Sequence, residues 1–469
     1  MLAPHQLSHR PQPLSMMSSA GDWPPSIPSI TVLRCGWDHE AGWVDAERKN
    51  AMATTGSAPL RIGMIGSGFM ARFHLQAMAG VRDVVIGGVF SPVQQRREDF
   101  RRRVDAAGLG PCRSFASAEE LAGSDDIDAV WVVAPNDQRV AHLRAIAAAA
   151  GARRRPLLGV ACEKPLGRTL AEARELVRLA EQAGLNHGYL ENQVFAPSVR
   201  RGKDIIWRRA AAASGRPYLA RASEEHSGPH APWFWQAERQ GGGVLLDMLC
   251  HSFEVARFLL TEPGQPRTSL RLESASGTVA SLKWTQPRYI SQLRTIMGDA
   301  VDYATRPSED FARGTLTLRD QQGAVLLVEA STSWAYVGPG LRIQIELLGP
   351  EYAMEISTLS TGLRVFLSRE VTGQAGEDLV EKQNAEQGLM PVVEDEATLY
   401  GYVAENRHMV QAFLNGRVPE ETFHDGAAVL EALMALYRSA ETGRTVTLPD
   451  ETLASFVPAA ARPRPGHAG

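Results

Sequence analysis

An aspartate and a histidine interrupt an otherwise apolar stretch, and their spacing could serve proton chemistry. The stretch is GGGVLLDMLCHSFEVARFLL, residues 241–260, and the pair is Asp247 and His251. Residues four apart lie on one face of a helix, so the carboxylate and the imidazole would be presented together. Because the pKa of histidine lies near neutrality, its ring can exchange a proton with a substrate hydroxyl. The alternative interpretation is a surface Asp–His pair that contributes roughly a few tenths of a kcal/mol to helix stability.

A glycine-rich turn could bind a dinucleotide. LRIGMI at residues 60–65 predicts a short buried strand, and GSGFMA follows it with the pattern G-x-G-x-x-A. Small residues are needed there because the chain turns tightly and its backbone approaches a pyrophosphate at the start of a helix. A tight turn without a ligand is the alternative. The residues of this turn that we expect to contact the cofactor are Gly66, Gly68, Phe69 and Met70.

The segments after this turn alternate between strand and helix patterns up to about residue 190. This alternation predicts a doubly wound parallel sheet, whose ligands lie at the carboxyl ends of the strands. Lys164 directly follows one predicted strand, so we expect it beside the nicotinamide, with Pro165 restricting its backbone and a cis Lys–Pro bond compatible with the turn. The other residues at or just after strand ends that we expect to line the crevice are Ser91, Arg96, Pro135, Asn136 and Glu163.

The second predicted strand leaves the choice between NAD and NADP open. In NAD-selective sites an acid about 20 residues after the glycines bonds the ribose hydroxyls, and this chain has Ser91 at that place. Arg96 and Arg97 follow within two turns and could meet a 2′-phosphate or face solvent. The predicted cofactor is therefore NAD(P).

The sequence pattern changes at about residue 191, where runs of alternating apolar and polar residues begin. These runs predict an open, largely antiparallel sheet, with GTVASLKWTQ at 277–286 as one strand. The predicted fold is α/β, with a Rossmann-type dinucleotide-binding domain over 59–190 and an α+β substrate-binding domain over 191–457. Helices remain for only one face of the second sheet, and LRIQIELLG suggests apolar residues on both faces. We therefore expect a homodimer or homotetramer formed through that sheet.

The segment EEHSGPHAPWFW is expected beside the reaction site, because its tryptophans could stack on a sugar ring and its histidines could bond hydroxyls. An aromatic core beneath a loop explains the tryptophans equally well. The predicted substrate-binding residues are Asn192, His226, Trp233, Trp235, Asp247 and His251, with Glu191 a weaker candidate. A minor alternative is a metal site from Asp247, His251, His226 and His230. No ligand spacing recommends that site, and we expect no metal.

Composition excludes several classes of function. The chain has 469 residues, 44% of them hydrophobic, and a net charge of −4, which gives no general attraction for nucleic acid or an anionic membrane. No apolar run reaches the roughly 18 residues of a membrane span. Four scattered cysteines favour a reduced, cytoplasmic protein. Residues 1–58 and 458–469 predict disordered tails, with a start at Met52 as the alternative for the first.

These motifs together resemble the Gfo/Idh/MocA family of dehydrogenases, named for glucose–fructose oxidoreductase, inositol dehydrogenase and a rhizopine-catabolism protein. The resemblance covers residue 60 to about 457. It rests on GSGFMA, APN at 134–136, EKPLG at 163–167 and GGGVLLDMLCH at 241–251. Family members oxidise or reduce sugars and cyclitols with NAD(P). The resemblance implies that Lys164, Asp247 and His251 form the catalytic set, with His251 as the base.

Three functions remain open from the sequence. The leading hypothesis is an oxidoreductase that transfers a hydride between NAD(P) and a secondary hydroxyl or ketone of a sugar, sugar derivative or cyclitol. A glycosidase or lyase of the same fold would oxidise a ring hydroxyl transiently, without net redox. A non-catalytic nucleotide-binding regulator is the third, and the catalytic set argues against it. Val194-Phe195 in place of an Arg-Phe pair, and no His soon after Asn136, leave the substrate open.

Overall fold

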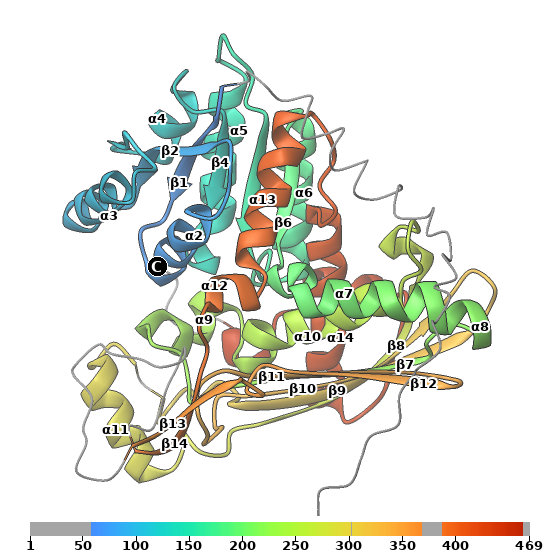
Figure 1. The fold of residues 1–469 in the computed structure, drawn as a ribbon. Helices are drawn as coiled ribbons and strands as arrows, with labels where there is room; N and C mark the ends of the chain where they lie inside the picture. Colours follow the sequence, from blue (N-terminus) through green and yellow to red (C-terminus); the bar gives the residue numbers. More distant parts are fainter. Residues whose placement is uncertain (1–57, 302, 368–386, 463–469) are drawn as a thin grey trace, which may run out of the picture. The chain divides into compact units, whose positions relative to one another are not determined.

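The computed structural model describes residues 58–301, 303–367 and 387–462. The predicted tail over residues 1–58, with the alternative start at Met52, falls almost entirely outside the described part. Two large sheets with packed helices make up the described part (Figure 1). Among the described helices, none combines the length and the apolar character of a membrane span.

Six parallel strands form the first sheet, in the order β3-β2-β1-β4-β5-β6. The strands are β1 (Leu60–Ile65), β2 (Val84–Phe90), β3 (Arg113–Ser114), β4 (Ala129–Val132), β5 (Gly159–Glu163) and β6 (Asn186–Leu190). The helices between them are α2 (Phe69–Met78), α3 (Gln94–Ala106), α4 (Ala118–Gly123), α5 (Arg139–Ala150) and α6 (Leu170–Gln182). The strand order reverses between β1 and β4, where such sheets bind their ligands. The predicted Rossmann-type sheet is confirmed.

Seven strands form the second sheet, in the order β12-β11-β7-β10-β9-β8-β15. They are β7 (Leu219–Glu225), β8 (Arg271–Ala280), β9 (Phe311–Arg319), β10 (Val325–Ser333), β11 (Arg342–Gly349), β12 (Tyr352–Ser357) and β15 (Val446–Thr447). Within this described sheet β7 and β10 pair in parallel, and the other neighbours are antiparallel. The predicted open, largely antiparallel sheet is confirmed.

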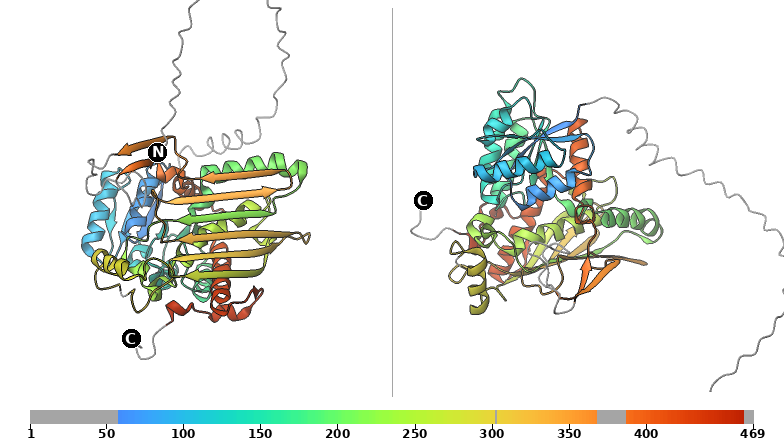
Figure 2. Two further views of the ribbon diagram at one scale, coloured as in Figure 1. Left: turned by 90° about the horizontal axis from the view of Figure 1, so that it is seen from below. Right: turned by 60° about the vertical axis from the view of Figure 1, so that its left-hand side comes forward.

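Helices α10 (Val244–Leu260) and α14 (Phe423–Thr442) pack on one face of the second sheet, and no described helix covers the other (Figure 2, left). In β11 the buried Ile343, Ile345 and Leu347 alternate with residues on the open face, which are Arg342, Gln344, Glu346 and Leu348. The open face also carries Arg221, which pairs with Glu329 and Glu346. The expectation of apolar residues on both faces holds in part, because the period of two in β11 puts three polar side chains and Leu348 outside, and Val325 and Leu327 of β10 are exposed on the same face.

One predicted strand of the second sheet is displaced. We expected a strand over 277–286, whereas β8 begins at Arg271 and ends at Ala280. The next residues leave the sheet because the backbone N–H groups of residues 282–284 all donate to the carboxylate of Asp310, at 2.7–2.9 Å. A side chain that binds three successive amides turns the chain around itself.

The remaining elements connect and cover these sheets. They are α7 (Pro197–Ile205), the π-helical η3 (Ile206–Ala211), α8 (Ala212–Ser214), α9 (Ala237–Gln240), α11 (Pro287–Met297), α12 (Glu396–Leu399), α13 (Tyr402–Leu414), β13 (Leu363–Leu367) and β14 (Gly388–Val392). Helix α11 and the β13–β14 pair were not predicted. Within the predicted C-terminal tail, Ala459–Ala461 form a 3-10 turn, and the N–H of Ala459 donates to Glu441.

Helix α13 belongs to the C-terminal part of the sequence but packs on the first sheet, beside α2 (Figure 1). Two glycines make this close approach possible. A Cβ at Gly159 of β5 would lie 2.5 Å from the ring of Phe413, and one at Gly188 of β6 would lie 2.5 Å from the sulfur of Met409. The buried side chains of α13 thus belong to the same apolar cluster as β1 and β2.

Candidate active site

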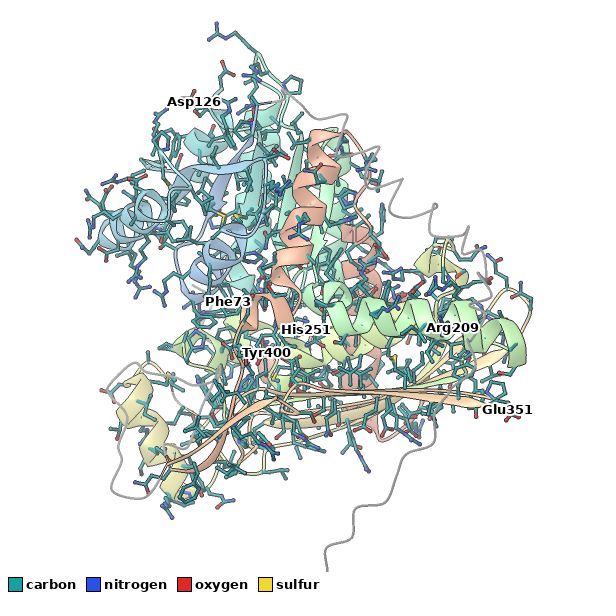
Figure 3. The ribbon with its side chains drawn as sticks, viewed as in Figure 1. Phe73, Asp126, Arg209, His251, Glu351 and Tyr400 are labelled. Atoms are coloured by element: carbon teal, nitrogen blue, oxygen red, sulfur yellow. The ribbon has the colours of Figure 1, made fainter. Side chains whose placement is uncertain are left out.

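A cavity of about 940 Å³ is lined by both domains. From the first domain it takes Gly66, Gly68, Phe69, Met70, Ser91, Arg96, Pro135, Asn136, Glu163 and Lys164. From the second it takes Asn192, His226, Trp233, Asp247 and His251. Figure 3 shows His251 in the middle of the molecule, above the second sheet. The structure therefore brings the predicted site residues to one cavity, except Trp235 and the weaker candidate Glu191, which are not among its lining residues.

Trp235 lies in the core. Its side chain is 3% exposed, its ring is 5.1–5.3 Å from those of Trp284, Tyr303 and Trp334, and its Nε1–H donates to the carbonyl of Pro229. The predicted contact of Trp235 with substrate is therefore not available, because neighbouring aromatic rings cover it. Trp233 remains on the cavity wall.

The helix that carries Asp247 and His251 is fixed at its start. The N–H groups of Gly243 and Leu245 donate to Oε1 of Glu309, at 2.9 and 3.1 Å, and the Tyr437 hydroxyl donates to the same oxygen at 2.5 Å. These contacts satisfy amides that have no partner within a helix. Every residue of α10 is buried, so the helix has one position relative to the cavity.

Lys164 is tied to α10. Its Nζ donates to the carbonyl of Asp247 at 2.8 Å and lies 3.3 Å from Oδ1 of the same residue. The Trp334 Nε1–H donates to the other carboxylate oxygen at 3.3 Å. Burial works to lower the pKa of Lys164, but Asp247 together with the other acidic groups around it, among them Glu224 and Glu163, raises the pKa, so the ammonium stays charged.

The turn that holds Lys164 is fixed by Arg139, three positions after Asn136. The buried guanidinium donates to the carbonyls of Ala134, Glu163 and Lys164, at 3.1, 2.5 and 3.1 Å. The Lys164–Pro165 bond is cis. The segment after Asn136 thus contains an arginine that positions the turn.

His251 is oriented by a carboxylate that follows the last strand of the first sheet. Its Nδ1 lies 2.5 Å from Oε1 of Glu191, which directly follows β6. With the Nδ1 proton donated to Glu191, Nε2 is the nitrogen that remains for a substrate hydroxyl. Burial works to lower the pKa of His251, but the charge and hydrogen bond of Glu191 together with the charge of Glu224 raise it, and the pKa lies above its usual value.

Glu163 takes part in a second buried pair. Its Oε1 lies 2.8 Å from Nε2 of His74 on α2, and its Oε2 accepts the backbone N–H of Lys164 at 3.0 Å. Burial works to raise the pKa of Glu163, but the hydrogen bond from His74 together with the nearby charges of Lys164 and Arg139 lowers it overall. Asn406 of α13 contacts Nδ1 of His74 and also accepts the Nε1–H of Trp131. A helix from the end of the chain therefore supports the Lys164 turn.

Sequence reasoning missed Glu224. This residue is the last but one of β7, lines the cavity and is 6% exposed. Its Oε2 accepts a hydrogen bond from Gln193 Nε2 at 2.6 Å. The signal was present: in LARASEE the period of two places Glu224 on the same face as the buried Ala220 and Ala222. An acid on the covered face of a strand needs a structural or functional reason.

The glycine turn fits a dinucleotide. A Cβ at Gly68 would meet no atom within 4 Å, so the space beside this backbone is open. At Gly66, where φ is +120°, a Cβ would lie 2.9 Å from Val133. The Ser67 hydroxyl is buried and has no hydrogen-bond partner in the described chain. An open cradle at the start of α2 with an unsatisfied donor is what a pyrophosphate requires.

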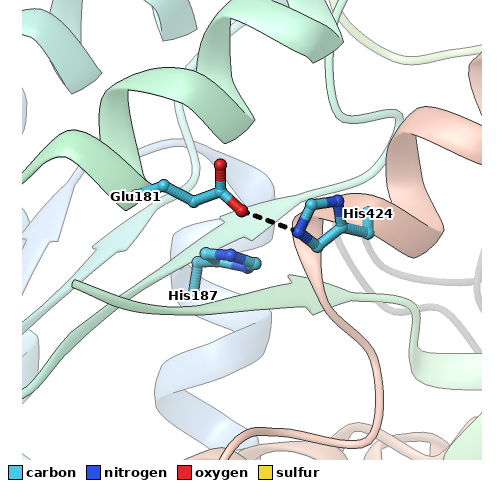
Figure 4. Close-up of side chains that lie close together, drawn as sticks. All are labelled: Glu181, His187 and His424. Carbon is cyan, nitrogen blue, oxygen red and sulfur yellow. Dashed lines mark hydrogen bonds and ion pairs between the residues drawn. The ribbon is translucent and has the colours of Figure 1, made fainter. Parts of the chain in front are cut away.

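Three possible metal ligands lie together away from this cavity, on Glu181, His187 and His424 (Figure 4). His424 Nε2 lies 3.0 Å from the Glu181 carboxylate, and His187 Nδ1 accepts the N–H of Phe423 at 3.0 Å. A neutral His187 then carries its proton on Nε2, which leaves no lone pair for a metal. We assign this group to the packing of α6, β6 and α14.

The alternative metal site of the sequence analysis is not assembled. His226 and His230 join neither Asp247 nor His251 in any described group of three ligands that lie within 4.8 Å of one another. His251 does group with Glu191 and Cys250. Burial raises the pKa of the Cys250 thiol well above its usual value, and its Sγ lies 3.2 Å from the carbonyl of Asp247.

Two family models match the chain. One describes the NAD-binding Rossmann fold of an oxidoreductase family and matches residues 60–189, and the other describes the C-terminal α/β domain of that family and matches residues 215–448. Among curated relatives, 1,5-anhydro-D-fructose reductase of Ensifer adhaerens is 33% identical over 46% of this chain and 61% of its own length. Rhizopine catabolism protein MocA of Rhizobium meliloti is 30% identical over 47% of this chain and 62% of its own length.

The match to these relatives thus spans about three fifths of their length. The crystal structure of GenD2 from gentamicin A biosynthesis in complex with NAD has the same fold, with a TM-score of 0.67 and 24% identity over 84% of this chain and 97% of that one. Because the two family models together match well over half of the chain, it belongs to the Gfo/Idh/MocA family of oxidoreductases.

Proposed function

We propose that the chain is an NAD(P)-dependent dehydrogenase or reductase that acts on a secondary hydroxyl or ketone of a sugar, sugar derivative or cyclitol. The observation that carries the proposal is the convergence of Lys164 and His251, each paired with a carboxylate, on the cavity that also holds the open glycine turn. The activities named for the curated relatives, such as 1,5-anhydro-D-fructose reductase, support the carbohydrate class.

The residues have separate parts in this chemistry. A bound nicotinamide supplies or accepts the hydride. In oxidation, Nε2 of His251 takes the hydroxyl proton, while Glu191 holds the ring and stabilises the imidazolium that forms. The ammonium of Lys164 donates to the substrate oxygen and stabilises negative charge developing there. Asp247 holds Lys164 in place, and Gly66 with Gly68 admits the pyrophosphate.

The test is incubation of the purified protein with NAD or NADP and a panel of polyols, sugars and glycosides. We expect net formation of reduced nicotinamide, measured by absorbance, in step with loss of one hydroxyl. Release of free sugar from a glycoside without net reduced nicotinamide would instead identify the glycosidase or lyase. Cofactor binding without either product would identify a regulator.

His251→Asn tests the base directly. The substitution keeps a polar side chain of similar size but removes the proton acceptor, so kcat should fall roughly 10²–10⁴-fold. NAD(P) affinity, measured by fluorescence, should stay within about threefold, because the glycine turn lies on another domain. A variant that folds, binds cofactor and turns over near the wild-type rate would assign the base to another group, with Lys164 the first to examine.

We also propose that the chain forms a homodimer or homotetramer through the open face of its second sheet, which no described helix covers. A cytoplasmic location is proposed as well, supported by the free thiols of Cys112, Cys162 and Cys250 in the described chain.

A further inference from the structure

A further carboxyl group faces the reaction site besides those of Glu163 and Asp247. Glu224 reaches the cavity from the end of β7, where the Thr332 hydroxyl donates to its carbonyl at 2.8 Å. Its side chain is almost fully buried, and Gln193, which holds its Oε2, is 4% exposed. The protein therefore holds the carboxyl in one position, as is typical of a side chain that binds a ligand.

The hydrogen bonds of Glu224 are incomplete. Oε2 accepts from Gln193, and Oε1 makes no hydrogen bond among the described residues. The neighbouring carboxylates are each paired with a basic side chain, since Glu191 lies 2.5 Å from His251, Asp247 lies 3.3 Å from Lys164 and Glu163 lies 2.8 Å from His74. Glu224 is the carboxyl of this site whose hydrogen-bond partner is a neutral amide.

The surrounding charges leave Glu224 without a counter-ion. The groups that act most strongly on it are His251, Lys164, Asp247 and Glu191, two bases and two acids. Their charges cancel when His251 is protonated, and they sum to −1 when His251 is neutral and able to accept a proton. Burial accordingly raises the pKa of Glu224, and His251 and Lys164 offset this only in part. A cation placed beside Oε1 would offset the free-energy cost of burying the charged carboxylate of Glu224.

We propose that Glu224 is a specificity-determining residue that binds a protonated amino group of the substrate, so that the preferred substrates are amino sugars or aminocyclitols. This inference rests on the proposed dehydrogenase function and refines its substrate class. The ammonium of the substrate donates to Oε1, while Gln193 keeps Oε2 in place. The hydroxyl that reacts lies at another carbon of the ring, facing His251 and Lys164.

The test compares substrates that differ only by an amino group in place of a hydroxyl. The pairs are glucosamine with glucose and an inosamine with the matching inositol, and N-acetylglucosamine removes the charge while keeping the nitrogen. We expect wild-type kcat/KM to favour the amine over the hydroxyl at least about tenfold and over the acetylated amine by more. Glu224→Gln should lower kcat/KM for the amine on the order of 10²-fold and change it less than about threefold for the hydroxyl.

Glu225→Gln is the matched control. This neighbour points to the other face of β7 and pairs with Arg342, so the preference for the amine should be unchanged. An equal effect of Glu224→Gln on both members of a pair, or a wild-type preference for the hydroxyl, would overturn the proposal while leaving the dehydrogenase function intact. Absence of reduced nicotinamide with every compound would overturn the proposed function instead.

A second measurement needs no variant. Thermal melting of the cofactor-loaded wild-type protein reports binding without turnover. Glucosamine should raise Tm more than glucose or N-acetylglucosamine at equal concentration, because only the protonated amine can form an ion pair with the Glu224 carboxylate. Equal shifts for the three sugars would contradict the inference even if Glu224→Gln fails to fold.

Discussion

At the scale of single residues, the chemistry of the site depends on how His251 is paired. Oxidation needs the unprotonated ring, and Glu191 raises the pKa of that ring. The kcat/KM for alcohol oxidation should therefore rise with pH through a pKa above 6.5, the usual value for histidine. Reduction should show the opposite limb, because it needs the protonated ring.

Glu191→Gln tests this pairing. The glutamine oxygen can still accept the Nδ1–H of His251, so the ring keeps its orientation, but the charge that raises its pKa is gone. The rising limb of the pH profile for oxidation should move to lower pH. Glu181→Gln, an exposed acid that pairs with His424, should leave the profile in place. A profile unmoved by Glu191→Gln would mean that another group sets the pH dependence.

Arg96 should decide the cofactor. The sequence could not tell which of two arginines faces the cofactor. In the structure Arg97 donates to the carbonyl of Ser91 at 2.7 Å, whereas Arg96 lines the cavity. No acid ends β2, and the nearby Asp99 is paired with Arg102. We expect Arg96 to contact the 2′-phosphate of NADP.

Arg96→Ala should therefore raise the Kd of NADP by about tenfold or more and leave that of NAD within about threefold, measured by fluorescence titration. Arg101→Ala on the same helix, where Arg101 pairs with Glu98 and Asp105, is the control. Equal losses of affinity for the two cofactors after Arg96→Ala would show that this residue does not bind the 2′-phosphate.

The residues within single motifs could be predicted, and their long-range partners could not. Lys164 and the Asp247–His251 pair follow from local spacing. Glu191 lies 60 residues from His251 and Trp334 lies 87 from Asp247, so their contacts depend on how the sheets and α10 pack. Trp235 shows the converse, because an aromatic residue beside a site pattern can belong to the core.

At the scale of elements, α10 positions the chemistry through its first turn. A Cβ at Gly243 would lie 2.4 Å from the carbonyl oxygen of Glu309. It would push the start of the helix away from the Glu309 side chain that accepts hydrogen bonds from its amides. Gly243→Ala should lower the free energy of unfolding by roughly 1–3 kcal/mol, by overpacking. It should also reduce kcat, because Asp247 and His251 move with the helix.

Gly123→Ala is the matched control for this substitution. Its Cβ would meet a single atom, the Cβ of Ala149 at 4.0 Å, so stability and kcat should be close to wild type. Denaturant unfolding and steady-state kinetics provide the two measurements. If Gly243→Ala unfolds at the wild-type denaturant concentration, the contact between Glu309 and the start of α10 does not constrain the helix.

Most elements could be predicted from their periodicity, and the exceptions have physical causes. The end of β8 is set by Asp310, which binds three amides of the following loop and leaves no pattern in the strand itself. Helix α13 was expected as a helix, but its packing on the first sheet depends on glycines at positions 159 and 188. Nothing in the sequence distinguishes those glycines from other residues of a strand.

At the scale of the whole molecule, the open face of the second sheet determines what the chain can pair with. The face carries charged residues together with exposed apolar ones such as Val325 and Leu327, so a partner must match charges and also cover apolar surface. A hollow in this face is lined by both signs of charge, including Arg221, Arg313 and Glu346. A second copy turned by a two-fold axis presents the same groups in reverse, which allows opposite charges to meet.

Arg221→Glu tests this association. Arg221 pairs with Glu329 and Glu346, so the substitution leaves three acids together on the face and sets like charges against each other across a symmetric interface. We expect the wild type to sediment as a dimer or tetramer at micromolar concentration and Arg221→Glu to shift toward the monomer. Arg201→Glu, on α7 away from this sheet face, should not change the mass. A monomeric wild type, or an Arg221→Glu oligomer as stable as the wild type, would place the interface elsewhere.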